Sequence, residues 1–388
     1  MFSTNSLISL AKGSLTQNSP VYVQYYITAR CNLTCEQCNI IYANADVEEI
    51  SLDKIKKIAD NFLKMKVAMV LLTGGEPFAR KDLPEIIKEF EMRGIHVRMQ
   101  TNGLASEEQI AKVVEAGGKD ISISLDSLNG LLQDKINGGY KKSWDKAIDS
   151  IVNFSKYLPK KNSFASLGCV MSKNNLDDIK DVIEFGTKIS WHTSLVPIHI
   201  TEQSAPKGFR TFDKSLKFNE NEIEKAVKLI DEIREMRNNH YLLYDSDQYL
   251  DDIKKFISGK EITWRDKNQK ICDSPNLYFA LLPNGEFAPC CDYRLSNEYF
   301  AYDDNFPKIY KEQNFRKEVK SLVSKCDGCM YGSYPEISIS MRFLKAKIQR
   351  AKTFFINPPK KRWPLTKDDV LQIVEEILQN KNAQKNKI

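Results

Sequence analysis

Three cysteines lie close together near the start of the chain, in the spacing C-x3-C-x2-C. They are Cys31, Cys35 and Cys38, in the stretch ARCNLTCEQCNI. A structural zinc site takes four ligands, usually as paired C-x2-C units, and the four histidines of this chain are distant in sequence. A four-iron cluster bound by only three cysteines keeps one iron open to a small molecule. The spacing therefore favours an iron–sulfur cluster over a structural zinc site.

A second group of cysteines lies in the last third of the chain. Its members are Cys272, Cys290, Cys291, Cys326 and Cys329. The stretch from Cys272 to Cys290 contains two strand-like runs around a Pro-Asn-Gly turn, and Asn-Gly is a strong hairpin signal. The hairpin would bring Cys290 towards Cys272, and the later C-x2-C pair completes four ligands. A four-cysteine zinc ribbon and a second iron–sulfur cluster both fit, and Cys291 competes with Cys290 for the fourth place. Cys169, within an apolar run, is expected to be a small core residue.

The elements that must position these thiols alternate between strand and helix patterns. The predicted strands cover residues 21–28, 67–73, 95–101, 120–126, 164–172 and 192–200. Helical patterns follow at 52–64, 83–94, 106–118, 143–158 and 176–188, with a further long one at 219–239. Repeated β–α units predict a parallel sheet. The expected fold class is α/β, a partial (β/α)6 TIM-like barrel with a cysteine-rich extension and a helical tail. Chemistry is expected at the carboxyl ends of the strands, where the first cysteines lie.

Three further motifs follow successive predicted strands. LLTGGEP (71–77) follows the second, QTNG (100–103) the third and SLDS (124–127) the fourth. In this order with C-x3-C-x2-C, they resemble the radical S-adenosylmethionine (radical SAM) superfamily over roughly residues 20–200. The resemblance implies that Cys31, Cys35 and Cys38 hold a [4Fe–4S] cluster whose open iron binds SAM. It implies these cofactor-binding residues: Gly74, Gly75, Glu76, Pro77, Asn102, Ser124 and Asp126. Gln37 departs from the aromatic or apolar residue usual before the third cysteine.

The second cysteine group resembles the SPASM/Twitch extensions of radical SAM enzymes. Gly285 lies five residues before Cys290, as in the G-x4-C hairpin of those extensions. The resemblance implies a second, auxiliary [4Fe–4S] cluster held by Cys272, Cys290, Cys326 and Cys329. The domain boundaries expected are 1–240 for the barrel, 241–335 for the auxiliary cluster domain and 336–388 for the basic tail.

The resemblance implies an enzyme, a radical SAM oxidoreductase. It would cleave SAM reductively to a 5′-deoxyadenosyl radical and abstract a hydrogen from a small or lipid-linked polar metabolite, with the auxiliary cluster transferring an electron. A peptide or protein maturase, forming a cross-link, a thioether or an epimerised residue, is the first alternative. A non-catalytic metal-binding scaffold is the second. A flavodoxin- or ferredoxin-type protein is the expected electron donor.

Composition and charge bound the remaining possibilities. The chain has 388 residues, 42% of them hydrophobic, and no apolar run long enough to span a membrane. Its net charge is +6, but residues 341–388 alone carry +8, so the rest sums to −2. The near-neutral body excludes nucleic acid as an expected partner. The tail is expected to pack as a helix with a solvated cationic face or, alternatively, to touch a membrane surface. The expected location is the cytoplasm, with membrane association through the tail as the alternative.

Overall fold

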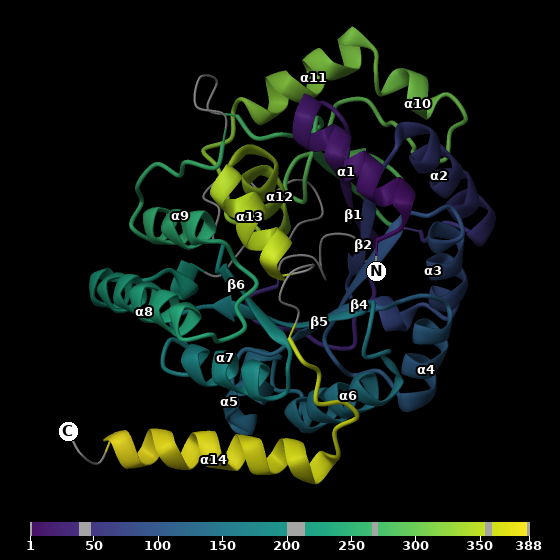
Figure 1. The fold of residues 1–388 in the computed structure, drawn as a ribbon. Coiled ribbons are helices and arrows are strands. Elements are labelled where there is room, and N and C mark those ends of the chain that lie inside the picture. The colour runs from purple at the N-terminus through teal and green to yellow at the C-terminus, as the bar shows by residue number, and fades with distance from the viewer. Residues whose placement is uncertain (1, 39–47, 200–213, 266–270, 354–358, 386–388) are drawn as a thin grey trace.

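The computed structural model describes residues 2–38, 48–199, 214–265, 271–353 and 359–385 of the chain. Figure 1 shows a curved sheet whose outer face is covered by helices. The sheet has eight strands in the order β6-β5-β4-β3-β2-β1-β7-β8. They are β1 (Tyr22–Thr28), β2 (Met69–Gly74), β3 (His96–Thr101), β4 (Asp120–Ser124), β5 (Phe164–Met171), β6 (His192–Pro197), β7 (Tyr278–Leu281) and β8 (Phe287–Ala288).

The first six strands are parallel and neighbour one another in chain order, so the predicted partial barrel is confirmed. Helices connect and cover them: α2 (Leu52–Met65), α3 (Leu83–Glu91), α4 (Glu107–Glu115), α5 (Gly130–Ile136), α6 (Ser143–Tyr157) and α7 (Ile179–Lys188). Helix α2 begins at a Ser51 cap and buries Ile55, Ile58 and Phe62 at helical spacing. Apolar stripes of this kind seal the outer face of the sheet.

The cysteine-rich part of the chain continues the same sheet. Strand β7 pairs in parallel with β1, in the register Tyr22↔Tyr278, and β8 returns antiparallel to β7. Gly285 supplies the positive φ of 80° that the hairpin turn needs. The predicted hairpin is therefore present, and it extends the barrel sheet beyond β1. Helices α10 (Phe306–Ile309) and α11 (Gln313–Val323) follow the hairpin, whereas α8 (Glu220–Asn238) and α9 (Asp247–Ile257) lie beside β6 at the other edge of the sheet (Figure 1).

Helix α12 (Ser333–Arg342) packs against the inner side of the sheet. The Tyr334 ring stacks on Tyr278 at 4.7 Å and meets Tyr22 edge-on at 6.4 Å. Glu336, buried on the same helix, pairs with Arg350 of α13 (Leu344–Ala351) at 2.7 Å. Helices α12 and α13 are separate, because Phe343 adopts an extended backbone between them.

The two ends of the chain are also helical. Helix α1 (Thr4–Thr16), which the sequence analysis did not predict, packs against α12. Helix α14 (Lys367–Lys385) lies across α6 and α7, where Lys381 forms an ion pair with Asp181 at 2.6 Å. Among the described helices, none combines the length and apolar character needed to cross a bilayer.

Candidate active site

The loop that carries the first three cysteines is held by the loop after β2. The backbone N–H of Gly75 donates to the Thr28 carbonyl at 2.8 Å, and that of Glu76 to the Arg30 carbonyl at 2.8 Å. A Cβ on Gly74 would lie 2.2 Å from the Thr28 oxygen, and one on Gly75 the same distance from the Arg30 oxygen. Both glycines are therefore needed for the two loops to approach this closely.

A cavity of about 290 Å³ opens above this loop at the carboxyl ends of the strands. The predicted residues that line it are Cys31, Cys35, Cys38, Gly74, Gly75, Asn102, Ser124 and Asp126. Because these residues come from the ends of β1 to β4, the strand order alone brings them together. The cavity is completed by Val170 of β5, Pro197 of β6, His199 just after β6, Cys291 in the segment after β8 and Tyr331 just before α12.

The three thiols suit a metal cluster electrostatically. Burial raises the pKa of Cys31 to about 11, and the pKa of Cys35 is raised further by burial and by the neighbouring thiols. Thiols in such surroundings stay protonated unless a cation stabilises the thiolate, which bound iron does. Among the described residues, no three Cys, His, Asp or Glu side chains converge tightly enough for a single metal ion. The donor set, three thiols around an open cavity, fits a cluster with one open iron.

Glu76 is placed behind the cavity wall. Its carboxylate accepts hydrogen bonds from the Thr101 hydroxyl at 2.7 Å, the Asn102 N–H at 2.8 Å and the Phe78 N–H at 3.1 Å. Burial nevertheless raises the pKa of Glu76 to about 7. Pro77 opens the short 3₁₀ helix that follows. Glu76 thus links the loop after β2 to the end of β3, next to Asn102.

Asp126 links the far side of the cavity to the cysteine loop. Its carboxylate accepts a hydrogen bond from the Val170 N–H at 2.6 Å and one from the Gln37 side-chain amide at 3.1 Å. Burial raises the pKa of Asp126 to about 6. Gln37, which replaces the aromatic or apolar residue usual at this position, therefore contacts Asp126 just after β4. A side-chain amide is well suited to this contact because it can donate to the carboxylate.

The second cysteine set forms a separate group beside the hairpin. The charge of Cys290 acts on the pKa of Cys272, of Cys326 and of Cys329, and burial raises the pKa of each of those three. Two cationic side chains hold the surrounding backbone: Arg265 donates to the Cys326 carbonyl at 2.9 Å, and Arg294 to the Cys290 carbonyl at 3.2 Å. Four thiolates around a cluster carry net negative charge, which guanidinium groups offset. The set fits a fully ligated second cluster.

Cys291 faces the cavity of the first cysteine set. It is 4% exposed and lines the 290 Å³ cavity, whereas the Cys326 and Cys329 thiols line a neighbouring cavity of about 590 Å³. His199, at the end of β6, lines both cavities. Its ring stacks on Tyr331 at 4.4 Å, and within the described chain neither ring nitrogen has a hydrogen-bond partner. Burial lowers the pKa of His199 to about 4, so its imidazole is neutral near pH 7.

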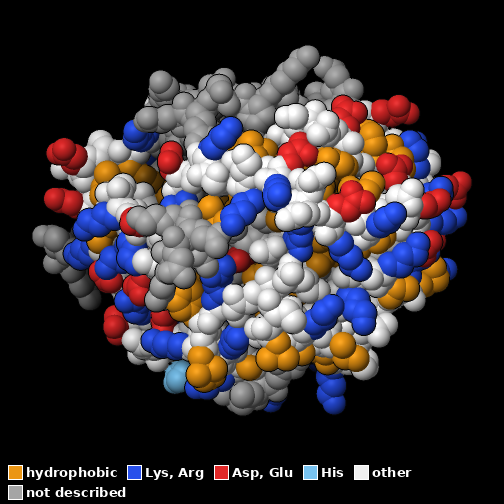
Figure 2. Space-filling model, turned by 90° about the horizontal axis from the view of Figure 1, so that it is seen from above, with side chains coloured by type: hydrophobic (Ala, Val, Ile, Leu, Met, Phe, Trp, Pro, Cys, Tyr) orange, Lys and Arg blue, Asp and Glu red, His pale blue; other side chains and the backbone are white. Residues whose placement is uncertain are grey.

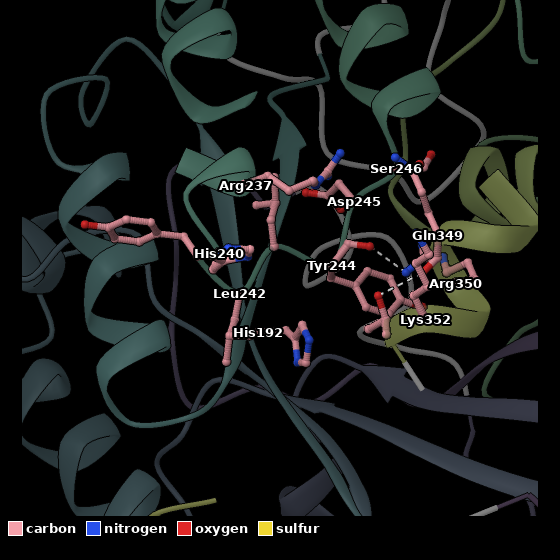
Figure 3. Close-up of a pocket in the computed structure, with 13 residues that line it drawn as sticks. His192, Arg237, His240, Leu242, Tyr244, Asp245, Ser246, Gln349, Arg350 and Lys352 are labelled. Carbon is pink, nitrogen blue, oxygen red and sulfur yellow. Dashed lines mark hydrogen bonds between the residues drawn. The ribbon is translucent and has the colours of Figure 1, made fainter. Parts of the chain in front are cut away.

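A third cavity, about 280 Å³, lies at the opposite end of β6. His192, which begins β6, lines it together with the ends of α8 and α13, and Figure 3 shows Arg237, Tyr244 and Arg350 around it. Arg350 donates to the Tyr244 carbonyl at 2.6 Å, drawn as a dashed line in Figure 3. In barrels of this class, chemistry occurs at the carboxyl ends of the strands. This cavity is therefore not assigned to catalysis.

Comparison with known proteins identifies the family. Residues 25–186 match the Radical SAM superfamily. The chain is 30% identical over 219 residues to a probable GTP 3′,8-cyclase of Pyrococcus abyssi, covering 56% of this chain and 70% of that protein. It is 29% identical over 165 residues to the mycofactocin maturase MftC of Mycolicibacterium smegmatis, covering 42% of this chain and 41% of that protein. The chain belongs to the radical SAM superfamily, whose cofactors are a [4Fe–4S] cluster and SAM.

A solved structure extends the likeness through the cysteine-rich half. SuiB of Streptococcus suis, bound to its precursor peptide SuiA, superposes with a TM-score of 0.61 at 16% identity, covering 85% of this chain and 78% of SuiB. At that identity the likeness concerns the fold. The match to the curated maturase spans less than half of that relative's length.

Several cavity residues were not predicted from the sequence. Gln24 and Tyr26 point into the cavity from β1, where their alternation was a usable signal, and the Gln24 amide donates to the Tyr26 hydroxyl at 2.6 Å. His199 and Tyr331 come from segments more than a hundred residues apart in the chain. The two rings come together only in the folded chain, where the segment after β6 lies against the segment before α12.

Proposed function

We propose that the chain is a SAM-dependent radical oxidoreductase that uses a second [4Fe–4S] cluster as electron acceptor. One observation carries the proposal: Cys291 lines the cavity of Cys31, Cys35 and Cys38, and its neighbour Cys290 belongs to the second cysteine set. The segment that contains Cys290 and Cys291 therefore connects the second cysteine set to the cavity of the first set. A substrate in the cavity would lie between an oxidant of C–H bonds and an acceptor for the resulting electron.

When bound, the reduced cluster and SAM supply a 5′-deoxyadenosyl radical that abstracts a hydrogen atom from a substrate C–H bond. The chain's own residues do the rest. Cys31, Cys35 and Cys38 would hold the cluster, and the backbone of Gly74 and Gly75 would face the methionine end of SAM. Asn102, Ser124 and Asp126 offer hydrogen-bonding groups for its ribose and amino-acid parts, and Glu76 positions Asn102 through the 2.8 Å backbone bond.

Oxidation of the substrate radical requires one electron and one proton to leave. When bound, a second cluster, which Cys272, Cys290, Cys326 and Cys329 would hold, would supply the acceptor for the electron. The proton would leave to solvent, because burial lowers the pKa of His199, which lies between the two cavities, to about 4 and makes its imidazole a weak base near pH 7. The balance is two hydrogens lost from the substrate, one to 5′-deoxyadenosine and one as a proton and an electron. A one-electron donor of the flavodoxin or ferredoxin type would reduce the first cluster.

The substrate class proposed first is a small or lipid-linked polar metabolite. Gln24, Gln100 and Ser333 also line the cavity, and these hydrogen-bonding side chains suit a polar molecule that binds beside the cluster and SAM. The second candidate is a peptide. It is favoured by the relative named as a maturase and by the fold neighbour described with a bound precursor peptide.

Anaerobic turnover tests the proposal. Dithionite-reduced protein is expected to convert SAM to 5′-deoxyadenosine and methionine, and the Cys31→Ala/Cys35→Ala/Cys38→Ala variant to form neither. Metabolite and peptide fractions of a cell extract are then compared for their stimulation of this cleavage. Stimulation by the peptide fraction alone would replace the first substrate class by the second. No cleavage by the iron-loaded wild type would favour the non-catalytic scaffold instead.

A further inference from the structure

Helix α1 exposes its apolar side chains and buries its small ones. Ser6, Ser9 and Gly13 are buried, whereas Leu15 is 86% and Ile8 56% exposed. Close packing explains the buried face: the Ser6 hydroxyl lies 2.8 Å from the Ala68 carbonyl, and a Cβ on Gly13 would lie 2.2 Å from Val21. A surface helix normally turns its apolar stripe inward. The outward stripe of α1 is thus available to an external apolar partner.

Helix α13 repeats this arrangement next to α12. Leu344 is 71% and Ile348 48% exposed, while Ala346 is buried. The inner side of α13 is fixed by polar contacts, since Arg350 pairs with Glu336 and the Gln349 amide donates to Asp247 at 2.7 Å. Both α1 and α13 contact α12, and Figure 1 shows them on the side of the molecule that faces the viewer. The exposed apolar residues therefore belong to rigid helices on one side.

The charges that α1 and α13 themselves carry have one sign. The chain contains no Asp or Glu in residues 1–35 or 337–367, which include both helices. Lys12 lies on α1, Lys345 and Lys347 lie on α13, and Lys352 follows directly. Figure 2 shows hydrophobic patches among lysine and arginine side chains along its lower edge, the side that faces the viewer in Figure 1. One acidic side chain from outside these segments, Asp247, pairs with Lys345 at 3.1 Å. The other lysines flank the apolar groups as cations, which complement an anionic, partly apolar surface.

We propose that the α1–α13 face lies on an anionic lipid membrane. This face comprises the outward residues Leu7, Ile8, Lys12, Leu15, Leu344, Lys347, Ile348 and Lys352. The leucine and isoleucine side chains would enter the boundary between headgroups and acyl chains, and the lysines would contact anionic headgroups. An anionic membrane attracts the lysines and accepts the apolar side chains at the same surface, and this combination favours lipid as the occupant. The inference goes beyond the proposed reaction and does not depend on it.

Vesicle flotation of the anaerobically prepared holoenzyme tests the face. Wild type is expected to float with phosphatidylcholine vesicles that contain phosphatidylglycerol, to bind phosphatidylcholine alone weakly, and to dissociate at high salt. The Ile8→Glu/Leu15→Glu and Leu344→Glu/Ile348→Glu variants should each lose about tenfold in vesicle-bound fraction. Leu131→Glu on α5 is the matched control, because Leu131 is 85% exposed but lies outside the face, and it should bind as wild type does.

Three results would overturn the proposal. The first is wild-type protein that does not float with anionic vesicles. The second is equal loss of binding in Leu131→Glu and in the face variants. The third is a dimer that Ile8→Glu/Leu15→Glu dissociates, which would assign the face to a second copy. Iron content equal to wild type shows that each variant is folded, so none of these results can be attributed to unfolding.

Discussion

Cys290 and Cys291 are adjacent in the chain and have different surroundings. The charge of Cys290 acts on the other three thiols of its set, and Cys291 lines the cavity of the first cysteines. The sequence could not choose between them, because the two positions differ by one residue in a loop without regular periodicity. The spacing motif did predict Cys31, Cys35 and Cys38, since their ligand pattern is local.

This difference predicts different iron contents. Cys290→Ala is expected to lose the second cluster and retain about four irons per chain, whereas Cys291→Ala retains about eight. Iron and sulfide analysis after anaerobic reconstitution measures both. Cys169→Ala, which removes a buried core thiol, serves as the control and should also retain about eight. Loss of iron from Cys291→Ala with none from Cys290→Ala would reverse the ligand assignment.

Asp126 predicts a dependence of stability on pH. Because burial raises its pKa to about 6, above the usual value of 3.8, the folded chain binds this proton more tightly than the unfolded chain. The contribution of Asp126 to stability is therefore present below pH 3.8 and is lost as the pH rises towards 6 and above. Asp126→Asn has no such titration and can keep both hydrogen bonds.

Chemical denaturation of the cluster-free protein should reveal this loss. Between pH 5 and 7.5, Asp126→Asn is expected to gain about 1 kcal/mol of unfolding free energy relative to wild type. A difference that stays constant across this range, or falls with rising pH, would contradict the assigned shift. Lys112→Gln, an exposed change on α4, is the control and should keep a constant difference.

At the scale of elements, the glycine pair after β2 determines how closely the cysteine loop approaches. Gly75→Ala would place a Cβ 2.2 Å from the Arg30 carbonyl, so the cysteine loop must move. The variant is expected to reconstitute at least about two irons fewer per chain than wild type, and to lose about 2 kcal/mol of stability. Gly130→Ala is the control, because its added Cβ meets only ordinary contacts at 3.5 Å. Equal iron in both variants would contradict this role for the pair.

The predictable elements were those with a strong period. All six barrel strands and the helices α2, α3, α4, α6 and α7 were predicted within a few residues, because their apolar residues repeat at strand or helix spacing. The short helix α5 was not predicted. Helix α1 was missed, since its buried face consists of Ser and Gly and its apolar face points outward. Helix α12 was missed because it is enclosed by the sheet and carries apolar, serine and charged residues without a clear stripe.

At the scale of the whole molecule, α12 and α13 tie the tail to the interior of the barrel. Glu336 is 4% exposed, pairs with Arg350 at 2.7 Å and accepts a hydrogen bond from the Ser246 N–H at 2.7 Å. Glu336→Gln leaves a buried guanidinium without its counter-ion, which should cost about 3 kcal/mol of unfolding free energy. Glu108→Gln removes an exposed pair with Lys112 and should cost under about 1 kcal/mol. Similar costs in thermal or chemical denaturation would show that the Glu336 pair contributes little.

The proposed domain boundaries at residues 240 and 335 remain predictions. The cysteine-rich part shares its sheet with the barrel through β7, and the chain after it returns to the barrel as α12. No local pattern could predict this return, because it depends on pairing between segments more than two hundred residues apart. The functional consequence is that the segment with Cys290 and Cys291 connects the second cysteine set to the cavity of the first set.

The proposed reaction requires that the chain hold two clusters, one on each cysteine set. The most direct test is the iron and sulfide content of the anaerobically reconstituted Cys31→Ala/Cys35→Ala/Cys38→Ala variant beside wild type. The account predicts about eight irons in wild type and about four in the variant. Near-zero iron in the variant would contradict it, because the second cysteine set would then hold no cluster and could not accept the electron.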